Sequence, residues 1–210
     1  MARLQVSATH HAALDRWREA DWPLVVRQQE SDCPSHTVCL GLALPPDAVS
    51  GIKHRLPLRL ERGAISRYQN ACSLREVLPV LSEIWRDQLA RLATELAAAG
   101  LAAQVFGSAA LQALTGLRYL HENSDIDLLL HPASTTQLDT ALRCFGHYST
   151  DLPLDGEIVF PCGAGVAIRE WRVAVGTAVA ARVLAKRHGG VALLRTDHLR
   201  ASLALRQCMH

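Results

Sequence analysis

The amino-acid sequence predicts an α+β fold built from two parts, a small and mostly β N-terminal module over residues 1–79 and a larger domain over residues 80–210. Up to about Pro79 the chain is rich in proline, arginine and short apolar runs bounded by turn residues, a pattern typical of strands. Beyond that point apolar residues recur with helical spacing and alternate with strand-like runs. This second pattern predicts a mixed sheet flanked by helices.

The N-terminal module is expected to hold one helix and three strands. Residues Ala8 to Glu19 predict the helix. Strands are predicted at Trp22–Arg27, Thr37–Leu42 and His54–Leu60, and the Pro45-Pro46 pair ends the second of them. Together these elements make a small β-rich module ahead of the larger domain.

The larger domain is expected to begin with a helix. Ser82 is a suitable N-cap, a set of apolar residues shares one helical face, and Gly100 stands where a helix commonly ends. The apolar residues of that face are Trp85, Leu89, Leu92 and Leu96.

Strands and helices then alternate to the end of the chain. In order, the predicted elements are a strand over Ala103–Phe106, a helix from Gly107 to about Leu114, a strand over Asp125–Leu130, a helix that Ser134 caps and that reaches about Phe145, a hairpin of Glu157–Phe160 with Gly165–Ile168, a second hairpin of Val183–Lys186 with Val191–Leu194, and a terminal helix capped by Asp197.

The composition narrows the class of protein. A formal net charge of +2 and an aromatic content of 5% disfavour a nucleic-acid-binding protein. No apolar run is long enough for a signal peptide or a membrane span, and the six cysteines include no CxxC pair that would indicate a zinc site. We therefore expect a cytoplasmic protein with free thiols that binds neither nucleic acid nor membrane.

Gly107 and Ser108 stand where a predicted strand turns into a helix. Glycine lets an anion approach the backbone closely, and the unpaired N–H groups of the helix start and the serine hydroxyl can then bind a phosphate. A Gly-Ser pair before a helix is by itself more often only a cap, so its meaning depends on the residues around it.

Two aspartates lie on the next predicted strand, within the run Ser124 to Leu130. Side chains alternate across a strand, so Asp125 and Asp127 point to the same side. Paired carboxylates repel one another unless a cation or a proton lies between them. Oxygen ligands of this kind suit Mg²⁺, which keeps several waters and accepts phosphate oxygens. The pair alone would also fit a solvated strand start, yet two aspartates directly before a run of leucines are unusual on a strand that enters a core.

The two motifs together resemble the nucleotidyltransferase superfamily, which includes DNA polymerase β and the antibiotic adenylyltransferases. The resemblance implies a polymerase-β-like fold for the larger domain. It also implies that Gly107 and Ser108 bind a triphosphate and that Asp125 and Asp127 bind metal. In that pattern a third carboxylate on a later strand completes the site.

Three acids are candidates for this third carboxylate. Glu157 is preferred because apolar residues follow it into a strand. Asp155 lies two positions away on the same face of that strand, and Glu170 is a further candidate. The sequence leaves the choice among them open.

The connection between the motifs carries a more specific resemblance. The run from Gln112 to Tyr119, with the pattern Gln-x-x-Thr-Gly-x-x-Tyr ahead of Ser-Asp-x-Asp-Leu-Leu, is similar to the phosphoribosyl-dephospho-CoA transferase of bacterial malonate decarboxylase, also called its holo-acyl-carrier-protein synthase. Further runs that support it are Trp22–Arg27, Asp155–Pro161 and Arg169–Trp171.

What this resemblance implies is a defined group transfer. Such enzymes take 2′-(5″-triphosphoribosyl)-3′-dephospho-CoA and transfer its phosphoribosyl-dephospho-CoA part to a serine of the apo acyl-carrier subunit of malonate decarboxylase, with release of pyrophosphate. Asp125 and Asp127 would be the catalytic pair. Glu157 is kept beside them as the preferred third carboxylate, and Mg²⁺ is the expected cofactor.

Basic residues are candidates for binding so highly charged a donor. Lys53–Arg55 form one cluster and Lys186–His188 another, and for both clusters a solvated loop is the preferred interpretation. Arg118 and Tyr119 lie in the connection that carries the family resemblance and are candidates for contact with the base or ribose. Arg118 and Lys186 are retained as candidate substrate-binding residues.

Three alternatives remain open at this point. The chain could use an ordinary nucleoside triphosphate on another acceptor, or it could be the citrate lyase counterpart, which performs the same transfer on a different carrier. It could also be a binding module that has lost activity, although the presence of both aspartates with Gly107 and Ser108 argues against that.

Overall fold

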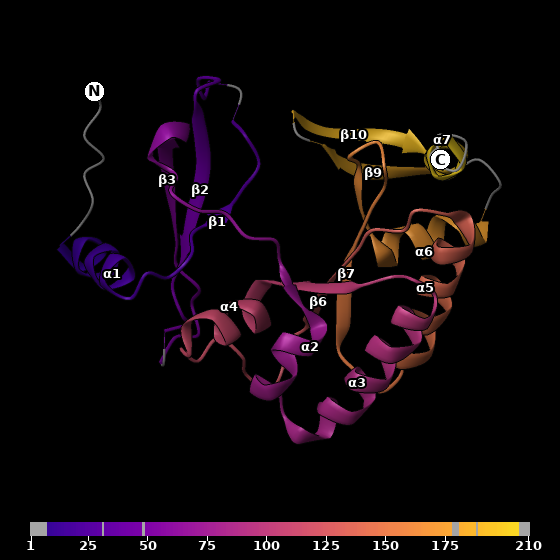
Figure 1. Ribbon diagram of the computed structural model, residues 1–210, viewed down its shortest axis with the longest axis horizontal. Coiled ribbons are helices and arrows are strands. Elements are labelled where there is room, and N and C mark those ends of the chain that lie inside the picture. The colour runs from indigo at the N-terminus through magenta and orange to yellow at the C-terminus, as the bar shows by residue number, and fades with distance from the viewer. Residues whose placement is uncertain (1–7, 31, 48, 178–180, 188, 206–210) are drawn as a thin grey trace.

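The computed structural model describes residues 8–30, 32–47, 49–177, 181–187 and 189–205. It confirms the α+β class, with a three-stranded sheet in the N-terminal part and a seven-stranded mixed sheet in the rest of the chain (Figure 1). Within the described residues, none of the helices combines the length and the hydrophobicity that crossing a lipid bilayer requires.

The N-terminal part holds helix α1 (Ala8–Glu19) and three antiparallel strands in the order β1-β2-β3. The strands are β1 (Val25–Val26), β2 (Thr37–Ala43) and β3 (Arg55–Glu61). The helix has the predicted bounds, but β1 is shorter than predicted.

The residues before β1 are held by α1 rather than by the sheet. The backbone N–H of Trp22 donates to the carbonyl of Trp17, and the Trp17 indole N–H donates to the carbonyl of Pro23. Pro23 has no N–H to offer a strand partner, so strand pairing begins only after it.

The larger sheet has the strand order β10-β9-β8-β7-β6-β5-β4. Its strands are β4 (Cys72–Ser73), β5 (Ala103–Phe106), β6 (Ile126–Leu130), β7 (Leu154–Val159), β8 (Gly165–Ala167), β9 (Arg182–Arg187) and β10 (Gly190–Arg195). Neighbouring strands are antiparallel except β6 and β7, which run parallel because helix α5 (Thr135–Tyr148) carries the chain back between them. Both hairpins predicted after residue 154 are confirmed.

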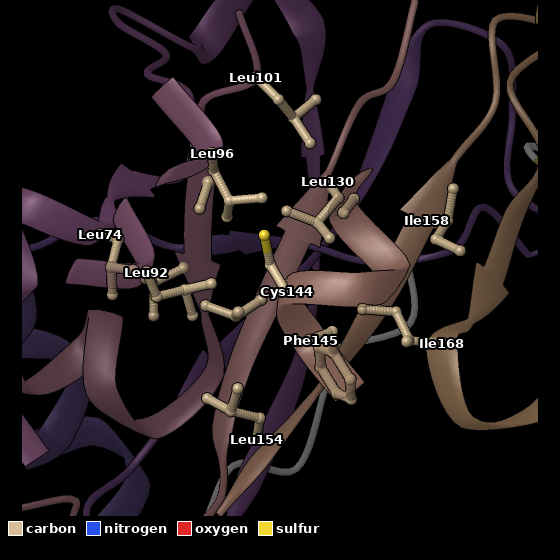
Figure 2. Packing of buried hydrophobic residues seen from close by; sticks show 14 of the residues in the cluster. Leu74, Leu92, Leu96, Leu101, Leu130, Cys144, Phe145, Leu154, Ile158 and Ile168 are labelled. Carbon is tan, nitrogen blue, oxygen red and sulfur yellow. The ribbon is translucent and has the colours of Figure 1, made fainter. Parts of the chain in front are cut away.

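Helices cover one face of this sheet. Besides α5 they are α2 (Leu74–Val77), α3 (Glu83–Ala98), α4 (Gly107–Thr115), α6 (Ile168–Thr177) and α7 (Thr196–Leu205), with a short 3₁₀ turn at Leu78–Val80 (η2). A second 3₁₀ turn, Arg62–Ala64 (η1), follows β3 in the N-terminal part. Figure 2 shows side chains of this core, among them Leu96 of α3, Cys144 of α5, Leu130 of β6 and Leu154 of β7.

The described cysteines are free, as predicted, and Cys208 lies outside the described residues.

Alternation along the central strands separates an apolar face from a polar one. Ile126, Leu128 and Leu130 of β6 are buried in the core, whereas Asp127 and Leu129 between them are half-buried on the other face. The polar residues of the strands therefore point away from the covering helices.

Three elements of the larger body differ from the prediction. Ile168 begins helix α6 and does not end a strand, because Ile168 and Trp171 lie one helical turn apart and both are fully buried. Strand β4 and helix α2 were not predicted. They precede residue 80, yet β4 pairs with β5 and Leu74 of α2 lies in the larger core, so the boundary at residues 79/80 stays a prediction.

Gly156 allows β6 and β7 to pair closely. Its φ is +151°, and a Cβ at this position would lie 2.1 Å from the carbonyl oxygen of Leu128 on the neighbouring strand. A side chain there would force the two central strands apart.

We expect Gly156→Ala to lower the free energy of unfolding by about 2–4 kcal/mol, because the methyl group meets backbone atoms that cannot rotate away. Urea unfolding followed by circular dichroism measures the change. Gly63→Ala is the matched control, since a Cβ there meets no atom within 4 Å. Equal unfolding midpoints for the two variants would contradict this account of the strand pair.

Candidate active site

Gly107 forms the junction between β5 and α4. Its φ of +68° lies in the left-handed region that favours glycine, and a Cβ there would stand 2.2 Å from Oδ2 of Asp127. The residue before it, Phe106, cannot cap the helix with its side chain. The first N–H groups of α4 therefore remain available to an anion, and glycine lets the Asp127 carboxylate lie directly beside them.

The two aspartates of the Asp-x-Asp motif occupy the end of β6 that faces this junction. Asp127 pairs with Phe106 of β5, and Asp125 lies immediately before the first residue of β6. Asp127 is half-buried and Asp125 is exposed. The structure thus brings Asp127 to the start of α4, with Asp125 at the outer edge of the same site.

The parallel strand β7 adds two further acids on the same face. The register pairs Asp127 with Asp155 and Leu129 with Glu157. Asp155 is therefore the direct neighbour of Asp127, and Glu157 lies two residues further along the sheet. The Asp155 Oδ1 also accepts a hydrogen bond from the backbone N–H of Gly156 at 2.8 Å.

The surroundings of Asp127 disfavour its ionised form. Burial raises its pKa first, and the charges of Asp155 and Asp125 follow as the next largest causes, with Glu157 contributing least. The charge of Lys53 opposes them, and the pKa still rises to about 6. Asp155 therefore acts on Asp127 more strongly than Glu157 does.

All three candidates for the third carboxylate have partners of their own, and they differ in how strongly a basic group binds them. Glu157 forms an ion pair with Lys186 of β9. Glu170 lies on α6 and accepts a hydrogen bond from the backbone N–H of Leu184 at 2.5 Å, so it holds β9 in place. The Arg169 Nε lies 3.6 Å from the Asp155 Oδ1, which leaves Asp155 beside Asp127 with a weaker partner.

Of the basic residues considered as substrate ligands, some contact the candidate site and others do not. Lys186 reaches the acidic face through Glu157, and His188 of the same cluster lies outside the described residues. Arg118 is exposed in the α4–β6 connection.

Lys53, for which a solvated loop was the preferred interpretation, donates a hydrogen bond from Nζ to the Ser108 hydroxyl at 3.2 Å. No local pattern indicates this contact, because the two residues are 55 positions apart.

The Gln-x-x-Thr-Gly-x-x-Tyr run braces the connection between the two motifs. The Gln112 side-chain oxygen accepts hydrogen bonds from the backbone N–H groups of Tyr119 and Leu120, each at 3.0 Å. Gly116 ends α4 with a φ of +69°. Tyr119 is buried and donates from its hydroxyl to the carbonyl of Ala43 at 2.8 Å. The run therefore has a structural role: its hydrogen bonds join α4 and the connection after it to the N-terminal sheet.

The acids suit a magnesium ion that takes few protein ligands. In the described part of the chain, no group of three or more His, Cys, Asp and Glu side chains is assembled closely enough to hold a metal by itself. Mg²⁺ commonly uses one or two carboxylates together with waters and substrate phosphates. Asp125, Asp127 and Asp155 supply oxygen donors of that kind beside an anion-binding helix start, and their mutual repulsion is what a cation would relieve.

We expect Asp127→Asn to stabilise the metal-free protein at pH 7.5 but not at pH 4. In the folded protein the pKa of Asp127 is raised from 3.8 to about 6. The neutral carboxyl therefore contributes stability that is fully present below pH 4 and is lost as the pH rises through 6. Asparagine avoids that loss, and the gain is about 1–2 kcal/mol after allowance for solvent screening at a half-buried group. Urea unfolding at the two pH values measures it, with Asp87→Asn on the exposed side of α3 as the control. A gain that is the same at both pH values would contradict the charge argument.

The sequence matches two family models that together span most of the chain. Residues 2–71 match the phosphoribosyl-dephospho-CoA transferase MdcG N-terminal domain, and residues 73–197 match the C-terminal domain. No solved structure matches the chain significantly.

Curated relatives agree with these models. A protein named phosphoribosyl-dephospho-CoA transferase from Xanthomonas campestris pv. campestris (strain 8004) is 36% identical over 184 residues, which cover 86% of this chain and 82% of the relative. Proteins of the same name are 33% identical over 159 residues in Bradyrhizobium diazoefficiens (75% of this chain, 69% of the relative) and 35% identical over 161 residues in Pseudomonas aeruginosa (73% and 70%). The chain is therefore a transferase enzyme that belongs to the phosphoribosyl-dephospho-CoA transferase family.

Proposed function

We propose that this enzyme transfers phosphoribosyl-dephospho-CoA from 2′-(5″-triphosphoribosyl)-3′-dephospho-CoA to a serine of the apo acyl-carrier subunit of malonate decarboxylase, in the cytoplasm and with release of pyrophosphate. The observation that carries the proposal is the close approach of Asp127 to the Gly107 junction, beside a second carboxylate from β7. An anion-binding helix start and paired acids are what a phosphorus-centred displacement requires.

The donor's triphosphate would lie against the start of α4. The N–H groups after Gly107 and the Ser108 hydroxyl would donate hydrogen bonds to phosphate oxygens, since no side-chain cap at Phe106 binds the helix start. Asp125 and Asp127 would hold Mg²⁺, with Asp155 beside them. When bound there, Mg²⁺ neutralises the triphosphate and makes its α-phosphorus more electrophilic.

The acceptor serine would approach the α-phosphorus from the side of β7. A bond forms from the serine oxygen to the α-phosphorus, the bond from that phosphorus to the β-phosphate oxygen breaks, and pyrophosphate leaves. A nearby carboxylate takes the serine proton. We assign this role to Asp155 in preference to Glu157, because Asp155 is the direct neighbour of Asp127 whereas Glu157 is paired with Lys186.

Intact-protein mass spectrometry tests the transfer directly. The wild-type enzyme with Mg²⁺, the triphosphoribosyl donor and the apo carrier subunit is expected to add one phosphoribosyl-dephospho-CoA to the carrier. The Asp125→Ala, Asp127→Ala double variant and a chelator should each abolish the gain. A folded wild-type enzyme that leaves donor and carrier unchanged would sink the proposal, and the apo citrate lyase carrier or ordinary nucleoside triphosphates would then be tried.

The same assay separates the two β7 acids. Asp155→Asn is expected to lower kcat at least about a hundredfold, which is the scale that removal of a general base costs. Glu157→Gln should lower it less than about tenfold, because it removes an ion pair at the edge of the acidic face. The reverse order of the two variants would return the role to Glu157.

A further inference from the structure

Lys53 joins the N-terminal sheet to the phosphate-binding junction of the larger domain. It lies between β2 and β3, and its ammonium group donates to the Ser108 hydroxyl at 3.2 Å. Its charge is also the influence that lowers the pKa of Asp127 against the surrounding acids. One cation is therefore near both the start of α4 and the metal-binding acids.

The loop that carries Lys53 is braced on both sides. The backbone N–H of Leu44 donates to the carbonyl of His54 at 2.9 Å, and the N–H of Asp47 donates to the carbonyl of Ile52 at 3.0 Å. The Asp47 Oδ1 accepts from the backbone N–H and the hydroxyl of Ser50, which holds the pKa of this carboxyl below its ordinary value. Lys53 therefore lies between two residues, Ile52 and His54, whose carbonyls accept backbone hydrogen bonds from the opposite side of the hairpin.

The N-terminal sheet is in turn fixed to the helix that carries Ser108. The Tyr119 hydroxyl donates to the carbonyl of Ala43, which is the last residue of β2. Trp17, Leu42, Leu111 and Tyr119 form one buried apolar cluster, and Leu111 belongs to α4. Figure 1 shows α4 next to the base of the N-terminal strands. The position of Lys53 beside Ser108 therefore follows from contacts made by both parts of the chain.

Lysine has three N–H donors and no acceptor, and a compact charge that suits phosphate. Its hydrogen bond goes to the hydroxyl at the start of α4, where an anion is expected to bind. On the basis of the proposed function, we infer that Lys53 binds the outer phosphates of the donor, so that the phosphate subsite is shared between the two parts of the chain. Tyr119 is the positioning residue, because its hydrogen bond to Ala43 fixes the N-terminal sheet against the segment that follows α4.

Steady-state kinetics with Lys53→Met tests the binding role. The donor KM is expected to rise about tenfold or more, as for loss of a charge-assisted hydrogen bond, while the KM for the carrier stays within about twofold. Lys53→Arg should recover part of the loss. Arg62→Met is the matched control, since it removes the same charge from the same sheet at the far end of β3, about 20 Å away.

Tyr119→Phe removes the hydroxyl that contacts Ala43 and leaves the ring in place. The donor KM should rise about threefold with little change in carrier KM or in melting temperature, because the variant displaces Lys53 without unfolding the protein. A carrier KM that rises as much as the donor KM would overturn the positioning role.

Binding of inorganic tripolyphosphate, followed by calorimetry in magnesium buffer, distinguishes failure of this inference from failure of the proposed function. Lys53→Met should weaken that binding about tenfold, whether or not the wild-type enzyme transfers to the carrier. An unchanged tripolyphosphate affinity in Lys53→Met would overturn the inference. If Arg62→Met weakens tripolyphosphate binding as much as Lys53→Met does, the inference is overturned as well.

Discussion

The carboxylate of Asp127 lies against the backbone of Gly107, where strand β5 turns into helix α4. This contact depends on antiparallel pairing of Phe106 with Asp127 and on a positive φ that a side chain would make costly. It places a carboxylate, a kind of ligand that Mg²⁺ accepts, beside a helix start whose N–H groups could bind an anion. Every other feature of the candidate site is arranged around that contact, including the acid of β7 and the lysine from the N-terminal sheet.

The site concentrates like charge at some expense in stability. Asp155 and Asp125 raise the pKa of a carboxyl that burial already disfavours as an anion, and helices cover only the opposite, apolar face of the sheet. Such an arrangement suits a protein whose ligands bring a divalent cation and phosphates to the same place. Lys53 and Lys186 supply part of the compensating charge from the two ends of the acidic face.

Local patterns in the sequence predict most of what surrounds the site. Alternation of apolar residues with Asp127 places β6, and Gly107 with Ser108 marks the strand-to-helix turn, because both features lie within a few residues of the chain. The register that sets Asp155 beside Asp127 belongs to a parallel pair joined by α5, and sequence spacing does not fix it. The sequence therefore cannot tell Glu157 from Asp155 by distance to Asp127, and the choice of third carboxylate stays a prediction.

Long-range contacts account for the rest. Lys53 of the β2–β3 loop donates a hydrogen bond to Ser108 of α4. In the run from Gln112 to Tyr119, Gln112 binds the backbone of the α4–β6 connection and Tyr119 binds the carbonyl of Ala43. The start of helix α6 does not show in the sequence because Ile168, its first residue, follows Ala167 of β8 with no turn residue between them. In each case the information lies in packing between elements and not in any one of them.

Asp127 is held among like charges, and a bound cation would relieve their repulsion. Carbon-13 carboxyl NMR of the wild-type protein tests it, with the resonance assigned by its absence in Asp127→Asn. In metal-free buffer the Asp127 carboxyl should titrate with a pKa of about 6, and saturating Mg²⁺ should lower that pKa. A pKa near the ordinary aspartate value that does not respond to Mg²⁺ would contradict the account.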